Sequence, residues 1–350
     1  MVRAHDSPTC KSTLSLLSRR SYIWSCSPAF FPLERGRRLS TRAKRSKDKR
    51  GYDPTSTRSL HILYQIPPIR PCQHIEIYGP LGTRAYVRAG LTYTHTLLGA
   101  PYVVHELRVP SDPQDNFSDF SLHPAESPHG RNIPLVDGAW ADLYKDETVS
   151  VSAAPILHSV PCIGYVVNEA PVPRKLDPRD YIPHIKRTNA PMSILGQLQK
   201  GESVTLADGT VLRGPERQKG RKIVILGDTY DPSPIAPLAD GADVLIHEAT
   251  NAHLPGIDSS TKDSDTYESV EARAKSRGHS TPQMAGDFAR RVNAKKLVLN
   301  HFSSRYSGAQ CDEAKKIMSS IAGLAAGEYG GDVICAEDLM SIDINLDPVV

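Results

Sequence analysis

The sequence predicts an α/β protein in which helices pack against a β-sheet. Three short apolar and β-branched runs lie in the second half of the chain: Lys222–Leu226, Asp243–Ile246 and Lys296–Leu299. Each run is followed within two residues by polar residues. Between the last two runs, Thr281 is placed to cap a helix that has Pro282 at its first position. The apolar stripe of this helix is formed by Met284, Phe288 and Val292. Strands that alternate with an amphipathic helix indicate a layered α/β domain.

The first half of the chain contributes three more predicted strands, at Ile75–Tyr78, Tyr102–Leu107 and Val149–Ile156. A Gly-Pro turn at residues 79–82 follows the first of them, and residues 83–92 can form a helix. Residues 110–134 are rich in Pro, Asp, Ser and Asn, which predicts a long surface loop. His123 and His129 lie in that loop without a periodic context, so we expect both side chains to be solvated.

Composition sets limits on the class of protein. Charged residues make up 23% and hydrophobic residues 39% of the 350 residues, which is ordinary for a soluble protein with one large domain or two smaller ones. The six cysteines are scattered, with no Cys-x-x-Cys pair, which indicates reduced thiols and argues against a structural zinc knuckle. No apolar run is long enough for a transmembrane helix, so we expect no membrane span.

The N-terminal segment, residues 1–73, differs in charge from the rest of the chain. Residues 1–50 hold thirteen Lys/Arg against three acidic residues, a net charge of +10, whereas the whole chain carries only +3. A basic, Ser-rich head is typical of a mitochondrial presequence. A disordered basic tail, or translated non-coding sequence, would have the same composition. Mitochondrial, nuclear and cytoplasmic locations therefore all remain open.

A second basic segment lies in the middle of the chain. Residues 170–222 contain eleven Lys/Arg and five acidic residues, with many Pro and Gly and weak periodicity. Such a segment can be an arm that reaches toward a polyanion, or an ordinary surface insertion with a solvated charge run. Composition alone does not separate these two interpretations.

Five polar residues stand where predicted strands give way to turns: His158, Asp228, Glu248, His279 and His301. Each residue alone is more often structural than functional, because turn aspartates cap helices and single histidines are common at strand ends. Their recurrence is informative, since strand ends that open onto a cleft carry the chemistry of α/β proteins. Carboxylates and imidazoles also suit a hydrolytic divalent-metal site, in which a Glu paired with a His can position a proton donor.

Several motifs resemble those of ribonuclease Z, the metallo-β-lactamase-fold enzyme that cuts the 3′ trailer from precursor tRNA. In chain order they are Ile77-Tyr78-Gly79-Pro80-Leu81-Gly82, Leu157-His158 with Gly164-Tyr165, Gly227-Asp228-Thr229, His247-Glu248-Ala249-Thr250, Gly278-His279-Ser280-Thr281 and His301-Phe302-Ser303-Ser304-Arg305-Tyr306. The resemblance covers residues 74 to about 340. The five motifs from Leu157-His158 onward occur in family order, which makes chance an unsatisfactory explanation.

The resemblance implies a fold class and a domain organisation. The expected fold is an α/β, metallo-β-lactamase-like αββα sandwich over residues 74–350, with an incomplete N-terminal half. A flexible arm inserted at about 172–214 would grip the tRNA elbow, although its tip at residues 190–196 matches the family loosely. The implied partners are precursor tRNA and a second copy of the chain in a homodimer.

The resemblance also implies roles for the five polar residues and a cofactor, Zn²⁺. In a site with two zinc ions, His158 would ligate one ion, Asp228 would bridge both and His301 would ligate the other. Glu248 and His279 would serve as the acid or proton-shuttle pair. The implied activity is zinc-dependent endoribonucleolytic removal of the 3′ trailer.

One family motif is absent from this sequence. Members carry a His-x-His-x-Asp-His motif ahead of the segment that matches Ile77 to Gly82, and no such motif occurs here. Each zinc would then keep two protein ligands, so we expect weakened binding. Two explanations remain open: a gene model that lost an exon, or a catalytically impaired relative that acts as an RNA-binding or partner subunit. A hydrolase of small esters or thioesters on the same fold would leave the basic arm without a use.

Overall fold

The computed structural model describes residues 21–23, 31–32, 75–114, 121–306 and 311–346. Most of the basic head lies outside these residues. The predicted targeting or disordered role of residues 1–73 therefore concerns mostly residues that the structure does not describe, and the histidines of that segment are among them. Two short strands of the head are described, β1 (Ser21–Ile23) and β2 (Phe31–Pro32).

The largest element of the fold is a seven-stranded sheet with the order β16-β15-β14-β13-β8-β7-β6. Its strands are β6 (Trp140–Lys145), β7 (Val149–Ile156), β8 (Cys162–Glu169), β13 (Lys222–Ile225), β14 (Val244–Glu248), β15 (Lys296–Asn300) and β16 (Asp332–Cys335). β13 to β16 run parallel, whereas β6, β7, β8 and β13 form antiparallel pairs. The predicted strands at residues 149–156, 222–226, 243–246 and 296–299 are confirmed, with ends that shift by a residue or two.

A second, smaller sheet has the order β2-β1-β3-β4-β5. Beside β1 and β2 it contains β3 (Ile75–Pro80), β4 (Tyr102–Arg108) and β5 (Asn132–Pro134). Apolar side chains of both sheets share one core, which includes Tyr78, Leu107, Trp140 and Tyr165. The Tyr165 hydroxyl also donates a hydrogen bond of 3.0 Å to the Tyr78 carbonyl, which ties the two sheets together.

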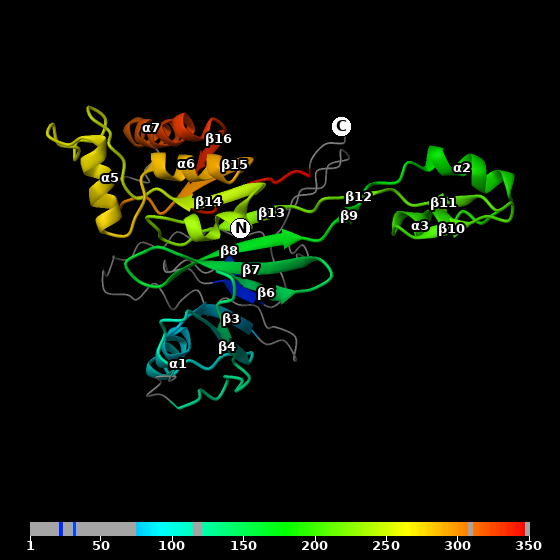
Figure 1. The fold of residues 1–350 in the computed structure, drawn as a ribbon, viewed down its shortest axis with the longest axis horizontal. Coiled ribbons are helices and arrows are strands. Elements are labelled where there is room, and N and C mark those ends of the chain that lie inside the picture. The colour runs from blue at the N-terminus through cyan, green and yellow to red at the C-terminus, as the bar shows by residue number, and fades with distance from the viewer. Residues whose placement is uncertain (1–20, 24–30, 33–74, 115–120, 307–310, 347–350) are drawn as a thin grey trace, which may run out of the picture.

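Helices cover the outer faces of the two sheets, which gives the expected four-layer αββα arrangement (Figure 1). On the large sheet these are α4 (Ala236–Ala239) with a preceding 3-10 turn at Ser233–Ile235, α6 (Pro282–Arg291) and α7 (Asp312–Tyr329). A further helix, α5 (Tyr267–Ser276), precedes α6 in the chain and lies to the side of this layer (Figure 1). On the small sheet α1 (Thr83–Tyr93) packs through Leu91. The predicted cap of α6 is confirmed, because the Thr281 hydroxyl accepts a hydrogen bond from the Met284 amide.

The structure corrects three local predictions. Residues 110–134 are not loop throughout, since Asn132–Pro134 pairs with β4 as strand β5. His123 is buried rather than solvated, because its Nδ1 accepts a hydrogen bond from the Ala125 amide and its ring lies 6.1 Å from that of Tyr102. His129 is exposed, as predicted. The first strand continues through Gly79 to Pro80, where a turn was expected.

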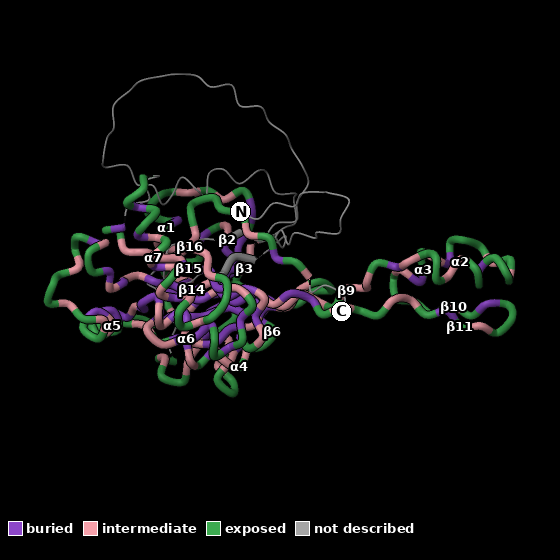
Figure 2. Tube along the Cα trace, turned by 90° about the horizontal axis from the view of Figure 1, so that it is seen from above, coloured by how far each residue is buried: buried purple, intermediate pink, exposed green. Residues whose placement is uncertain are grey.

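Residues 172–218 extend away from the body of the molecule (Figure 1), and most of their surface is exposed (Figure 2). A stalk of β9 (Val172–Pro173) and β12 (Arg217–Gln218) leads to α2 (Pro178–Arg187), α3 (Ile194–Gln199) and the hairpin β10 (Ser203–Thr205) and β11 (Val211–Arg213). The far end has a small core of its own: Leu176, Ile185, Ile194, Leu198, Leu206 and Leu212. We refer to residues 172–218 as the arm. Within the described residues, no helix is both long and apolar enough to span a membrane.

Candidate metal centre

The topology brings the five predicted site residues to one edge of the large sheet. Asp228, Glu248 and His301 lie at or just after the carboxyl ends of the parallel strands β13, β14 and β15. His158 precedes β8, which runs antiparallel to β13, so it lies at the same edge. His279 lies between α5 and α6, just before the capped start of α6.

The imidazoles of the cluster lie close to one another and to Asp228. The ring centroid of His279 lies 5.2 Å from that of His158 and 5.3 Å from that of His301. His301 Nε2 lies 3.5 Å from an Asp228 carboxylate oxygen. Asp228, His279 and His301 each offer one ligand atom, and these atoms lie within 4.8 Å of one another. The ligands expected from the sequence are His158, Asp228 and His301, so the two sets differ in one histidine. Both His158 and His279 belong to this cluster.

This donor set fits a zinc ion. Zinc holds nitrogen and oxygen ligands at about 2.0–2.2 Å with tetrahedral geometry, so two ligand atoms on one ion lie roughly 3.3–3.6 Å apart. The 3.5 Å between His301 Nε2 and the Asp228 oxygen falls within that range. A set of one aspartate and several histidines also favours zinc over magnesium or calcium, because imidazole nitrogen suits zinc and the other two ions prefer oxygen ligands.

Hydrogen bonds fix which nitrogen of each histidine can bind a metal. His158 Nδ1 lies 2.7 Å from the Gly278 carbonyl, which can only accept, so Nδ1 carries the proton and Nε2 keeps its lone pair. His301 Nδ1 lies 2.9 Å from the Thr250 hydroxyl oxygen, whose own proton goes to the Glu248 carboxylate. His301 therefore also carries its proton on Nδ1. Such backing of ligand histidines by carbonyl and hydroxyl oxygens is typical of metal sites.

Glu248 is the most enclosed acid of the cluster, with 1% of its surface exposed. Its Oε1 accepts a hydrogen bond of 2.7 Å from the Thr229 amide and lies 3.1 Å from His279 Nδ1. Its Oε2 accepts a bond of 2.5 Å from the Thr250 hydroxyl. Burial by itself would raise the pKa of Glu248, but the bonds from His279 and Thr250 outweigh it, so the pKa is lowered. Glu248 is thus held as a carboxylate.

The other ionisable groups of the cluster respond to this carboxylate. The hydrogen bond to Glu248 raises the pKa of His279 above its ordinary value, which favours the imidazolium form. The pKa of Asp228 is raised, chiefly because the carboxyl is buried. The nearby His301 lowers this pKa in part, and the negative charge of Glu248 raises it further. Two nearby carboxylates with opposite pKa shifts are common where one acid orients a proton donor and another faces a cation.

The backbone of the cluster contains two residues in the left-handed region. Gly278 has φ +86°, and a Cβ at this position would lie 2.3 Å from His158 Nδ1, so the close approach of the two segments requires glycine. His301 has φ +53°, which is uncommon for a non-glycine residue. Non-glycine residues held in this region, as His301 is, are concentrated at functional sites.

Sequence reasoning did not identify the residues that hold the cluster together. Thr229 donates its hydroxyl to the Leu157 carbonyl at 2.8 Å, and the Ser280 hydroxyl donates to the Thr229 carbonyl at 2.6 Å. Thr250 joins Glu248 to His301. All three hydroxyl residues lie within two positions of a predicted site residue, which is the signal that could have pointed to them. His247 is buried beside Phe288, its Nδ1 lies 2.7 Å from the Glu248 carbonyl oxygen, and burial lowers its pKa.

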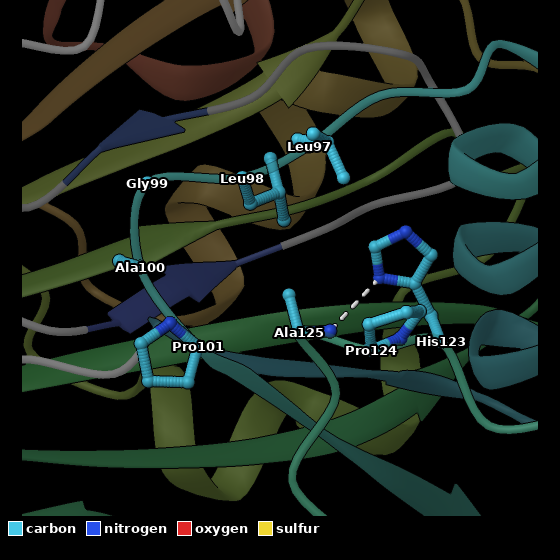
Figure 3. Close-up of a pocket in the computed structure, with 8 residues that line it drawn as sticks. All are labelled: Leu97, Leu98, Gly99, Ala100, Pro101, His123, Pro124 and Ala125. Carbon is cyan, nitrogen blue, oxygen red and sulfur yellow. Dashed lines mark hydrogen bonds between the residues drawn. The ribbon is translucent and has the colours of Figure 1, made fainter.

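A separate hollow of about 330 Å³ lies between the loop after α1 and residues 123–125 (Figure 3). Its lining is largely apolar, and it contains none of the five predicted site residues. His123 is the one ionisable side chain of its lining, and its Nδ1 is already occupied by the Ala125 amide. The hollow therefore offers no second centre for the chemistry described above.

Comparisons with known proteins identify relatives of this chain. It is 36% identical over 298 residues to zinc phosphodiesterase ELAC protein 1 of Bos taurus, and the match covers 78% of this chain and 75% of that protein. It is 32% identical over 255 residues to ribonuclease Z of Streptococcus agalactiae, covering 70% of this chain and 67% of that protein. Ribonuclease BN of Proteus mirabilis is 31% identical over 244 residues, covering 68% of this chain and 64% of that protein.

Among solved structures, the chain is similar to human tRNase Z, short form. The two are 30% identical, the match covers 82% of this chain and 71% of that chain, and the TM-score is 0.45. No family model matches the chain.

Proposed function

Because this chain belongs to the ribonuclease Z family, we propose that it is a zinc-dependent endoribonuclease that removes the 3′ trailer from precursor tRNA. The observation that carries the proposal is the cluster of histidines and carboxylates at the carboxyl edge of the large sheet, in a chain related to zinc phosphodiesterases and ribonucleases. Hydrolysis of a phosphodiester needs a cation to stabilise charge on the phosphate and a proton donor for the leaving oxygen. The cluster offers groups suited to both tasks.

We propose His158, Asp228 and His301 as the zinc ligands, with two ions and with Asp228 shared between them. The Nε2 lone pairs of His158 and His301 support this assignment, as does the 3.5 Å between His301 and Asp228. Bound zinc supplies Lewis acidity, which stabilises negative charge on phosphate and makes water a better nucleophile. Each ion would have two ligands from this set, fewer than the three or four usual for a tightly held zinc. We therefore expect weak binding.

We propose that Glu248 and His279 deliver the proton to the leaving group. In this hydrolysis the oxygen of water forms a bond to phosphorus and releases a proton to solvent, the bond from phosphorus to the 3′ oxygen breaks, and that oxygen takes a proton. His279 can supply the proton, because the Glu248 carboxylate at 3.1 Å favours its imidazolium form. Glu248 itself is held by Thr229 and Thr250, so the pair keeps one orientation.

The partners are proposed on other grounds. The arm carries the basic residues that a polyanion would contact, and we propose that it binds the elbow of precursor tRNA, away from the bond that is cut. A homodimer is proposed on the family resemblance alone.

Cleavage and zinc content together test the proposed function. Purified protein is incubated with a precursor tRNA that carries a 3′ trailer, with zinc or with a chelator, and bound zinc is measured on the same sample. We expect zinc-dependent release of the trailer, its loss in Asp228→Ala, and its retention in the control Asp263→Ala, which changes an exposed acid outside the cluster.

Two outcomes would contradict parts of this proposal. Cleavage that survives in Asp228→Ala would exclude the metal assignment. Protein that holds less than one zinc per chain, does not cut, and still binds precursor tRNA in a salt-dependent way would instead support an RNA-binding or partner subunit.

A further inference from the structure

The root of the arm contains a buried arginine. The Arg221 side chain is 6% exposed and lies directly before β13, where the chain returns from the arm to the body. Its Nε donates to Glu169 Oε2 and one terminal nitrogen donates to Glu169 Oε1, both at 2.7 Å, which makes a bidentate pair. Glu169 is the last residue of β8, where the chain leaves the body for the arm. One ion pair therefore joins the entry and the exit of the arm.

The backbone at the root reinforces this pair. The Glu169 amide donates to the Arg221 carbonyl at 2.8 Å, and the Arg221 amide donates to the Glu169 carboxylate at 3.2 Å. A Cβ on Gly220 would lie 2.1 Å from the Glu169 carbonyl oxygen, so the two strands approach as closely as a glycine allows. Farther out, the Arg217 side chain donates to the Pro171 carbonyl at 2.9 Å across the stalk.

A third segment is held by the same arginine. The other terminal nitrogen of Arg221 donates to the Ile344 carbonyl at 3.1 Å. Ile344 is itself buried in the core between the two sheets. The C-terminal segment is thereby attached to the root of the arm, and Arg221 is anchored to the body as well as to the stalk.

The same two strands connect the root of the arm to the candidate metal centre. β8 starts four residues after His158 and ends at Glu169, whereas β13 starts after Arg221 and ends three residues before Asp228. β8 contains eight residues, so its two end residues are seven steps of about 3.3 Å, or roughly 23 Å, apart. The strands pair with each other throughout β13. If the root fixes the direction of the arm, that direction is therefore also fixed relative to the candidate metal centre.

We propose that Arg221, through its bidentate pair with Glu169, is a positioning residue that sets the direction of the arm relative to the candidate metal centre. This inference rests on the proposed function, in which one precursor tRNA contacts the arm and the centre together. When a long ligand has bound one of two contact sites on a rigid body, its other end is held near the second site. The effective concentration for the second contact is therefore high. Loosening the root lowers that concentration without altering either contact site.

Arg221→Lys is the most informative variant for this inference. Lysine keeps the positive charge but cannot form the bidentate pair, so a role of charge alone would be preserved. Glu169→Gln removes the charge of the acid and keeps its shape, which gives a second, milder variant. The control is Arg273→Lys, because Arg273 also pairs with an acid, Asp265, but lies in α5, far along the chain from the root.

The direction of the arm can be measured on the protein alone. Spin labels are placed on ketone-bearing residues introduced at Val211 in the arm and Ala272 in the body, both exposed, and the distance distribution between them is recorded by pulsed electron resonance. We expect one narrow distribution in the parent and in Arg273→Lys, and a clearly broader one in Arg221→Lys and Glu169→Gln. An unchanged distribution in both root variants would overturn the proposal, whatever RNA the protein binds.

Binding of two RNAs, measured by fluorescence anisotropy, separates positioning from a general loss of structure. For full precursor tRNA we expect Arg221→Lys to lose about tenfold in affinity. For an isolated hairpin that represents the tRNA elbow, which reaches only the arm, we expect no change. Equal losses on both RNAs would mean that Arg221 maintains the arm itself, and no loss on either would also overturn the proposal. If the parent protein binds neither RNA, the proposed function fails, and the spin-label distances still decide the role of Arg221.

Discussion

At the scale of single residues, the sequence motifs identified the reactive side chains better than their supports. His158, Asp228, Glu248, His279 and His301 could be selected because each follows or precedes an apolar run in a matching motif. Their supports depend on contacts between distant segments, which no local pattern encodes. The His158 imidazole, for example, is held by the carbonyl of Gly278, 120 residues later in the chain.

Gly278→Ala tests the contact between these two segments. The new Cβ would lie 2.3 Å from His158 Nδ1, and φ is +86°, so we expect both backbone strain of about 1–2 kcal/mol and a displaced imidazole. Zinc affinity, measured by competition with a chelator, should fall about tenfold. Gly209→Ala is the matched control, because Gly209 has φ +84° with nothing within 4 Å of the new Cβ. Equal zinc affinities in the two variants would contradict the contact.

At the scale of elements, apolar runs predicted which segments form strands, but pairing decided where the strands end. β14 continues to Glu248 because its last residues pair with Leu299 and Asn300 of β15. The short strand β5 could not be recognised within a polar loop, because the contacts that hold it extended are with other segments: it pairs with β4, and the Trp140 indole donates to the Ile133 carbonyl. The cap of α6 was predictable, because a Thr before a Pro is a local signal.

Thr281→Ala tests the start of α6. Thr281 is fully buried, and its hydroxyl accepts from the Met284 amide, so we expect the free energy of unfolding to fall by about 1 kcal/mol in urea titrations. Ser193→Ala is a suitable control, because Ser193 precedes α3 but its side chain makes no capping hydrogen bond. The assignment of the cap would be wrong if both variants lost the same stability.

At the scale of the whole molecule, the apolar runs and the amphipathic stripe predicted a layered α/β domain, whereas the four-layer αββα arrangement followed from the family motifs. Nothing in the local sequence indicates that β1 pairs with β3, or that the seven strands of the large sheet follow their observed order. The basic, weakly patterned composition of residues 170–222 allowed two interpretations. It gave no sign that the far end of this segment has a core of its own, which is built from six buried residues.

Deletion of the arm tests whether it serves binding rather than folding. Val172 pairs with Gln218, so residues 172–218 can be replaced by a short glycine turn without stretching the root. We expect affinity for precursor tRNA to fall about a hundredfold, because one of two contacts is lost. Cleavage of a small phosphodiester, which reaches only the metal centre, should be retained. Equal loss on both substrates would indicate a structural role for the arm.

We propose above that histidines and Asp228 at the carboxyl edge of the large sheet hold hydrolytic zinc. The most direct measurement is an anomalous-difference map from crystals of this chain equilibrated with zinc. We expect a peak about 2.0–2.2 Å from a carboxylate oxygen of Asp228 and from an imidazole nitrogen of His301. A map with no peak at this cluster, or with zinc only at a cysteine, would contradict the claim.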